Sequence, residues 1–265
     1  TAAATAEFTT SFSTGNRNAL ASNSDLGIVY WGSGSTVYWW NPIDDTEGVL
    51  VDLTGQINGT LESAGATYHD HFYYFSAEVG GEANGLYRIA IDPRNGTAVV
   101  PGSLEEIAPN EPEDSLEAFY GTDLRPDYGD LTVLTVAGDP VMFGSVVDGF
   151  TGTGYWWSYN IATGVLTPIT TESSPNHVQL GTDLNGDTWG TSSSGVFYSV
   201  DPLTGAFTPT GDQVGFGLYD LSGSFCVAPP VADIDATKTL VANDDADGSG
   251  NVSPGDTITY QVSAT

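Results

Sequence analysis

The sequence predicts an all-β protein: a β-propeller of about five blades, followed by a short C-terminal β tail. Glycine occurs 33 times and proline 14 times in 265 residues, which is too often for a mostly helical chain. Aromatic residues make up 11% of the chain, enough to form a substantial core. Short β-branched and aromatic runs alternate with turn residues, and one hairpin pattern occurs four times.

The repeated hairpin consists of a strand, an Asp or Asn, a turn containing Gly, and a second strand. It occupies residues 38–53, 87–101, 156–170 and 197–211. Asp or Asn can bond the backbone two residues on, Pro fixes φ, and Gly supplies a positive φ. The side chains one and three positions before the Asp or Asn should share a buried face. One position before the Asp or Asn stand Trp40, Ile91, Tyr159 and Val200. Three positions before it stand Tyr38, Ile89, Trp157 and Tyr198.

Each hairpin has a further strand candidate upstream, which gives about four strands per unit. The candidates are residues 27–34, 71–79, 141–147 and 188–195. A hairpin about every 40–50 residues is typical of propeller blades. Residues 215–225 could form a fifth blade with N-terminal strands, and a pair of β-sandwiches is the alternative fold.

The segments YSVDPLTGAFTPTG and YRIAIDPRNGT resemble the blade tag Y-x-I-D-P-x-T-G-x-x-T of a family of secreted bacterial and archaeal β-propellers. The resemblance extends over about residues 20–228. It implies a propeller body over residues 1–228 and gives little information about function.

The charge of the chain is strongly negative. There are 34 Asp and Glu against five Lys and Arg, for a formal charge of −29. This excludes ordinary nucleic-acid binding and argues against docking on anionic membranes. No apolar run approaches the ~18 residues of a membrane helix, so we expect no membrane insertion. The start TAAATAEF is typical of a mature secreted or cell-surface protein, although a chain cut elsewhere would look the same.

The single cysteine, Cys226, excludes an intrachain disulfide. We expect it to be a small buried apolar residue, with an intermolecular bridge as the alternative.

Residues 229–265 are predicted to form a linker and a β-strand tail. The segments TKTLV and GDTITYQVSAT resemble the first strands of an Ig-like repeat domain of unknown function from large bacterial and archaeal surface proteins. Two strands alone are marginally stable. The chain is therefore either a fragment of a longer protein, or its tail strand adds to the sheet of a neighbouring subunit. The apolar face of that strand consists of Ile258, Tyr260, Val262 and Ala264.

The loop at residues 245–256 has the spacing of a calcium site. Oxygen ligands stand at positions 1, 3, 5, 7 and 12, and Gly250 stands at position 6. The ligands would be Asp245, Asp247, Ser249, Asn251 and Asp256. The loop ends in Asp and lacks flanking helices, so it resembles dockerin loops more than an EF-hand. The alternative is an acidic hairpin loop without calcium.

Three further patterns have competing interpretations. Asn58, Asn95 and Asn251 begin glycosylation sequons, and the first two also fit ordinary turns. Residues 183–187 space oxygens at alternate positions, and an Asn-Gly hairpin turn explains them better. The segment His69-Asp70-His71 could form a metal site with His177, but a structural strand is the preferred interpretation.

The sequence contains no Gly-x-Ser-x-Gly, HExxH or phosphate-cradle motif, so we expect no enzyme activity. The preferred function is an extracellular structural subunit that assembles head-to-tail with copies of itself into a filament or surface layer. The mechanism would be C-terminal strand addition, aided by Ca²⁺. The alternative is a lectin-like carbohydrate-binding module, or, less favoured, a glycoside hydrolase. Sugar-stacking candidates are Trp31, Trp39, Trp156 and Trp189, and candidate catalytic carboxylates are Glu62, Asp70, Glu78, Glu117 and Glu172.

Overall fold

The structure is a computed structural model of the 265-residue chain. It describes residues 18–61, 65–79, 82–108, 113–121, 124–125, 131–148, 153–174, 179–183, 186–192, 194–213, 236–244, 246, 248, 251 and 257–264. Contacts divide the chain into two compact units, Thr1–Val227 and Ala228–Thr265. Each unit is described by itself.

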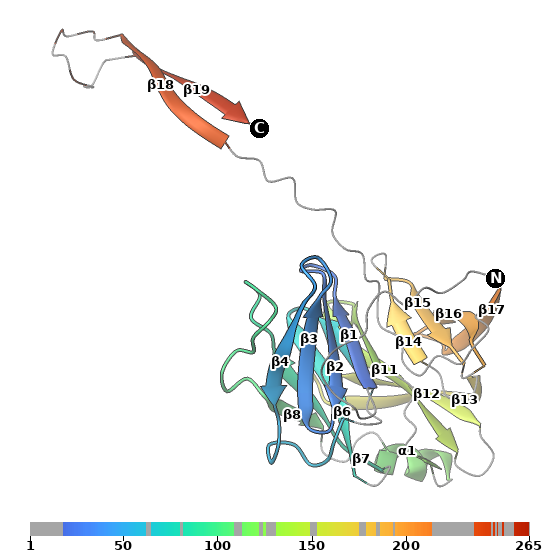
Figure 1. The fold of residues 1–265 in the computed structure, drawn as a ribbon. Helices are drawn as coiled ribbons and strands as arrows, with labels where there is room; N and C mark the ends of the chain where they lie inside the picture. The colour runs from blue at the N-terminus through green and yellow to red at the C-terminus, as the bar shows by residue number, and fades with distance from the viewer. Residues whose placement is uncertain are drawn as a thin grey trace. The chain divides into compact units, whose positions relative to one another are not determined.

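Four antiparallel sheets form the blades of a β-propeller in the first unit (Figure 1). Blade 1 consists of β1 (Asn18–Asn23), β2 (Ile28–Ser33), β3 (Thr36–Asn41) and β4 (Thr46–Asp52). Blade 2 consists of β5 (Ala66–His69), β6 (Phe72–Val79), β7 (Glu82–Ala90) and β8 (Glu105–Ala108). Blade 3 consists of β10 (Leu131–Val136), β11 (Asp139–Asp148), β12 (Gly154–Asn160) and β13 (Val165–Ser174). Blade 4 consists of β14 (Gln179–Thr182), β15 (Thr188–Thr191), β16 (Val196–Asp201) and β17 (Ala206–Gln213).

Two short elements precede β10. They are the helix α1 (Glu113–Tyr120) and the strand β9 (Leu124–Arg125), which pairs with β11. No helix in the described part of the chain is long and apolar enough to cross a membrane.

The predicted propeller is confirmed, and each of the four predicted hairpins lies in one blade. Their turns have the expected chemistry. The Asp201 Oδ1 accepts the Leu203 N–H at 3.0 Å, and the Asp92 Oδ1 accepts the Arg94 N–H at 3.0 Å. Gly96 reverses the chain with a φ of 67°, as the turn requires. The candidate fifth blade at 215–225 and Cys226 lie outside the described residues.

The core consists of three apolar clusters, each shared by two successive blades. Tyr30 of blade 1 and Phe75 of blade 2 belong to the first cluster. The second lies between blades 2 and 3, and the third between blades 3 and 4. Alternate side chains of one strand therefore enter different clusters: Met142 of β11 faces blade 2, and Phe143 faces blade 4.

The side chains at the positions predicted to face inward enter the core in three of the four blades. In blades 2, 3 and 4 they face the preceding blade and enter the core, as Ile89 and Trp157 show. In blade 1 the same positions lie on the side away from blade 2. There Tyr38 stacks on Trp31 with ring centroids 5.6 Å apart, and Trp39, expected to face outward, packs against the first cluster.

The second unit contains one antiparallel pair, β18 (Ala236–Asp244) and β19 (Thr257–Ala264). The register runs from Ala236 opposite Ala264 to Asp244 opposite Thr257, with one shift between Leu240 and Ala242.

Candidate functional site

A cavity of about 800 Å³ lies where the first strands of the four blades end. These inner strands are β1, β5, β10 and β14, and each lies beside the next in sequence order. The cavity is lined by residues of these strands, by the turns that follow them and by residues 201–203 at the β16–β17 turn. All four blades therefore contribute to one hollow, called the axial cavity below.

The bottom of the axial cavity is apolar and rigid. Five of the apolar residues that line the cavity are fully or almost fully buried members of the three core clusters. They are Ala21, Ala66, Leu131, Val133 and Leu180. Because these side chains also hold neighbouring blades together, this surface is fixed by core packing.

The rim of the axial cavity is polar and negatively charged. Asp25 follows β1, His69 ends β5, Asp183 follows β14, and Asp201 comes from the turn between β16 and β17. Hydroxyl groups of Thr67, Thr135 and Thr182 add donors and acceptors. No Lys or Arg is among the lining residues in the described part of the chain. The site therefore disfavours anions and suits neutral ligands rich in hydroxyl groups.

His69 lies at the junction of blades 2 and 3. Its Nε2 is 3.1 Å from the Thr135 Oγ1, across the two blades. Burial lowers the pKa of His69 below its ordinary value, and the nearby Asp70 carboxylate offsets part of that shift. The imidazole is therefore neutral at pH 7, with one nitrogen able to accept and the other able to donate.

Two rim carboxylates are held in place by their own turns. The Asp183 Oδ1 accepts the Asp187 N–H at 3.0 Å. The Asp201 Oδ2 accepts the Thr204 hydroxyl at 2.7 Å. These groups are positioned before any ligand arrives, which reduces the entropy lost on binding.

Tyr68 completes the side of the cavity next to His69. Its hydroxyl lies 3.3 Å from the His71 Nδ1. Burial raises the pKa of Tyr68 to about 12, and the charges of Asp25 and Asp70 act in the same direction. The phenol therefore remains protonated at neutral pH.

The His69-Asp70-His71 segment forms a turn, not the expected continuous strand. Asp70 and His71 have φ values of 46° and 66°, and they join β5 to β6. His69 and His71 are thus separated by a chain reversal. His177 lies outside the described residues, among which no three metal-ligating side chains come together. Asp183, Gly186 and Asp187 of the 183–187 pattern lie between β14 and β15, where the Gly186 N–H donates to the Asp183 carbonyl at 3.0 Å.

The other catalytic and sugar-stacking candidates whose side chains the structure describes do not line the axial cavity. Asp70 lies in the turn just described, and Glu117 lies on α1. Glu62 is outside the described residues, as are the side chains of Glu78 and Glu172. Trp31 and Trp156 are buried, and Trp39 and Trp189 are half-buried away from the cavity. The indole rings pack on the faces of the sheets, because both faces of each blade must be covered by side chains.

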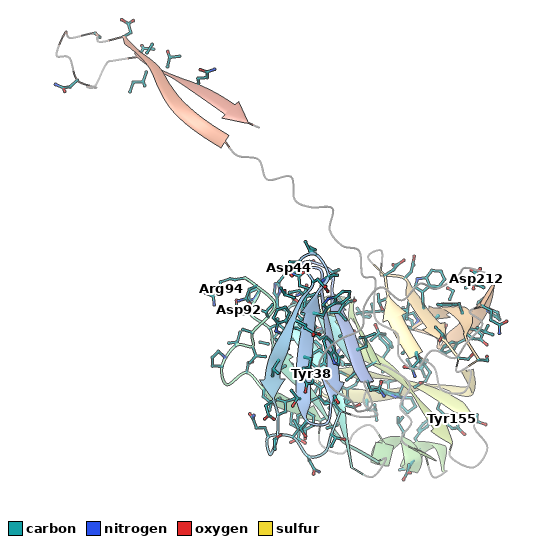
Figure 2. All side chains as sticks on the ribbon, viewed as in Figure 1. Tyr38, Asp44, Asp92, Arg94, Tyr155 and Asp212 are labelled. Carbon is teal, nitrogen blue, oxygen red and sulfur yellow. The ribbon has the colours of Figure 1, made fainter. Side chains whose placement is uncertain are left out.

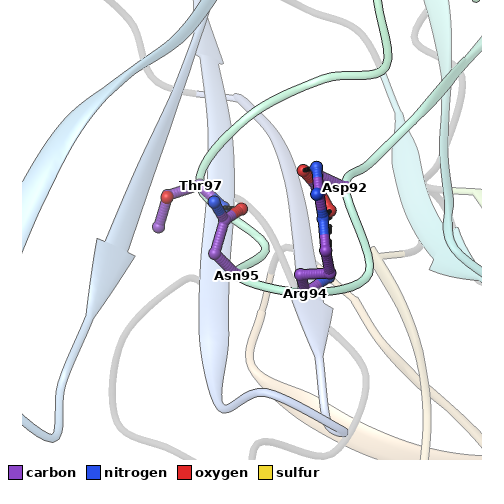
Figure 3. Close-up of polar contacts among 4 residues, drawn as sticks. All are labelled: Asp92, Arg94, Asn95 and Thr97. Atoms are coloured by element: carbon purple, nitrogen blue, oxygen red, sulfur yellow. Dashed lines mark hydrogen bonds and ion pairs between the residues drawn. The ribbon is translucent and has the colours of Figure 1, made fainter.

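The predicted glycosylation positions Asn58 and Asn95 are both exposed. Figure 3 shows Asn95 beside Thr97, whose N–H donates to the Asn95 Oδ1 at 3.1 Å. In the same turn, the Arg94 Nε donates to the Asp92 Oδ1 at 2.8 Å. The N–H of Asn58 donates to the Tyr87 hydroxyl at 3.3 Å. Modification at either residue stays a prediction.

The tail candidates are described only in part. Asn251 of the calcium-type loop is exposed, whereas Asp245, Asp247, Ser249 and Asp256 lie outside the described residues. The four predicted assembly residues belong to β19, where Ile258 is half-buried. Calcium binding, the Ig-like resemblance and the assembly role stay predictions.

Comparisons with known proteins find solved structures of low similarity. No family model matches the sequence, and no curated protein does. A luciferin-regenerating enzyme is 11% identical, with a TM-score of 0.41 over 73% of this chain and 60% of that one. The extracellular domain of BT4673 from B. thetaiotaomicron is 19% identical, with a TM-score of 0.40 over 80% of this chain and 24% of that one. The catalytic domain of a Coprinopsis cinerea GH62 α-L-arabinofuranosidase is 9% identical, with a TM-score of 0.42 over 76% of this chain and 70% of that one.

The comparisons correct the expectation that the chain is not an enzyme. Structures similar to this chain include an arabinofuranosidase catalytic domain and a luciferin-regenerating enzyme. The absence of short catalytic motifs carries no conclusion about activity, because a propeller can gather a site from turns that are distant in sequence. The similarity itself concerns only the fold, and the chain spans less than two thirds of the luciferin-regenerating enzyme.

Proposed function

We propose that the propeller binds a neutral, polyhydroxylated ligand of the carbohydrate class in the axial cavity, as a secreted or cell-surface protein. The observation that carries this proposal is the combination of an apolar bottom with a rim of carboxylates, hydroxyls and a neutral imidazole. A sugar ring presents the matching surfaces, since its C–H groups are apolar and its hydroxyls can donate to carboxylates.

The charges and the volume support the same ligand class. Anions are disfavoured by Asp25, Asp183 and Asp201, and none of the described residues that line the cavity is a Lys or Arg that would offset these charges. A volume of about 800 Å³ is within the range of small-molecule sites. His69 and the carboxylates are groups that acid–base catalysis also uses, so the test includes an assay for turnover.

Calorimetric titration with malto-, cello- and xylo-oligosaccharides tests the proposal. The variants Asp183→Asn and His69→Ala should each weaken binding by about tenfold, as expected for the loss of a charge-assisted or well-placed hydrogen bond. Asn keeps the acceptor that the Asp187 N–H requires, so the turn should persist. Asp212→Asn is the control, because Asp212 is an exposed acid of β17 outside the cavity (Figure 2).

No heat with any of these sugars would overturn the proposal. Chromatography of the same mixtures would detect shorter products. Product release by the wild type that both cavity variants reduce would extend binding to hydrolysis.

We also propose a second function, assembly of copies of the chain through the tail. Its support is that β18 and β19 pair only with each other among the described residues, which leaves outer edges for strand addition. We propose that Ca²⁺ held by residues 245–256 orders this hairpin. The partners would be identical subunits joined head-to-tail in a filament or surface layer.

Electron microscopy of the full chain, with millimolar Ca²⁺ or with a chelator, tests the assembly proposal. Regular filaments that disappear with the chelator are the expected result. Asp247→Ala should have the same effect as the chelator. Single particles under both conditions would overturn assembly, and filaments that ignore the chelator would overturn the calcium role alone.

A further inference from the structure

A second hollow lies next to the axial cavity, on the seam between blades 3 and 4. This seam groove has a volume of about 430 Å³. Its lining comes from β11, β12 and β13, with Val136 and Leu203 at one end. Those same two residues also line the axial cavity. The two hollows therefore meet at Val136 and Leu203.

The turn between β16 and β17 forms the ridge between the two hollows. Leu203 stands at this ridge with 61% of its surface exposed. The preceding residue, Pro202, is fixed from the other blade, because the Trp156 Nε1 donates to its carbonyl at 2.8 Å. A ligand that extends out of the axial cavity over Leu203 thus meets a rigid edge.

The seam groove has the same chemical character as the axial cavity. Phe143, Ile169 and Val165 give it an apolar wall, and Val165 is 54% exposed. Ser158, Asn160 and Thr167 supply hydroxyl and amide groups. Among the residues that the structure describes, no charged side chain lines the groove. The groove therefore suits the same neutral, hydroxyl-rich chemistry.

We propose that the ligand is an oligosaccharide chain, with one end in the axial cavity and its continuation over Leu203 in the seam groove. This proposal rests on the carbohydrate-binding function proposed above. The adjacency of the two hollows, which share Val136 and Leu203 in their linings, carries it, since a single sugar in the axial cavity would leave the adjoining groove empty. The chain end in the cavity is bound by the carboxylate rim, and the continuation is bound by the apolar wall.

The experiment is a chain-length series of malto-, cello- and xylo-oligosaccharides from one to six sugars, titrated against the full protein. In the wild type, affinity should rise at least about tenfold between the one-sugar and the four-sugar probes. Val165→Lys should remove this gain and leave the affinity for the one-sugar probe unchanged. Asp183→Asn should lower the affinity for every length.

Val49→Lys is a matched control, because Val49 is 50% exposed and lies on β4, the last strand of its own blade, outside both hollows. Equal affinity for all lengths in the wild type would overturn the chain proposal while leaving the axial cavity as a sugar site. Equal effects of the two valine variants would also overturn it. Absence of binding at every length would instead overturn the carbohydrate function itself.

Discussion

The indole Nε1 of Trp156 in blade 3 donates a hydrogen bond of 2.8 Å to the carbonyl oxygen of Pro202 in blade 4. The Trp156 ring is fully buried and packs edge-on against Phe207, with centroids 5.6 Å apart. One side chain therefore joins two sheets and positions the turn that borders both hollows.

Trp156→Phe removes this hydrogen bond and retains most of the ring. We expect the free energy of unfolding to fall by about 1–3 kcal/mol, because the Pro202 carbonyl loses its donor and a small void forms. Urea unfolding monitored by circular dichroism measures the change. Trp40→Phe is the control, since the Trp40 indole bonds the exposed Asp45 at 3.2 Å. A Trp156→Phe cost no larger than that of the control would contradict the assigned role.

Gly144 leaves room for the indole of Trp157 on the neighbouring strand. A Cβ at residue 144 would lie 2.5 Å from the Trp157 Cζ2. Gly144→Ala should therefore destabilise the propeller by about 1–3 kcal/mol through overpacking. Trp157→Phe removes the clashing part of the ring. The loss of unfolding free energy in the Gly144→Ala/Trp157→Phe double variant should therefore be smaller, by about 1 kcal/mol, than the sum of the losses in the two single variants. Strictly additive costs in a double-mutant cycle would show that Trp157 is not the obstacle.

The imidazole of His69 should titrate below the ordinary value of 6.5. Because burial favours the neutral form, this group's contribution to stability is fully present above pH 6.5 and is lost as the pH falls through the folded-state pKa. NMR titration of the ring measures the midpoint. Asp70→Asn should lower it further, because the Asp70 carboxylate raises the pKa of His69. A midpoint above 6.5 in the wild type would contradict the burial argument.

The Asp92 carboxylate should titrate near pH 2. Hydrogen bonds from the Arg94 side chain and from its N–H lower the pKa of Asp92 to about 2. The charged form is the one bonded in the fold, so its contribution is present above pH 3.8 and is lost as the pH falls through about 2. Arg94→Ala should return the midpoint toward 3.8 in a carboxyl NMR titration. An unchanged midpoint would assign the shift to the Arg94 N–H alone.

The sequence was informative where local chemistry determines the backbone. The turns at Asp92 and Asp201 form because an Asx side chain and a glycine two or more residues later suffice to reverse the chain. The strands around them follow from alternation, which needs no distant partner. Four blades could therefore be located from residues such as Ile89 and Trp157.

The candidate site was not foreseen, because its residues come together only through the arrangement of the four blades around one cavity. Asp25, Asp183 and Asp201 each read as ordinary turn residues, and their separation in sequence gives no signal of a shared cavity. Two residues singled out from the sequence, His69 and Asp183, lie on the rim, where His69 is a partner of Thr135. The best available signal was positional: a polar residue at the end of the first strand of each repeat.

Placing the apolar clusters between blades makes stability a property of adjoining pairs. A single sheet holds only half of each cluster, so blade 2 needs both blade 1 and blade 3 to cover its faces. The propeller then resembles a one-dimensional array with nearest-neighbour coupling. Damage at Met142 would weaken the attachment of blades 2 and 3, whereas damage one residue later at Phe143 would weaken that of blades 3 and 4. Adjacent positions of one strand thus report on different junctions, and substitutions along β11 can measure the strength of each junction separately.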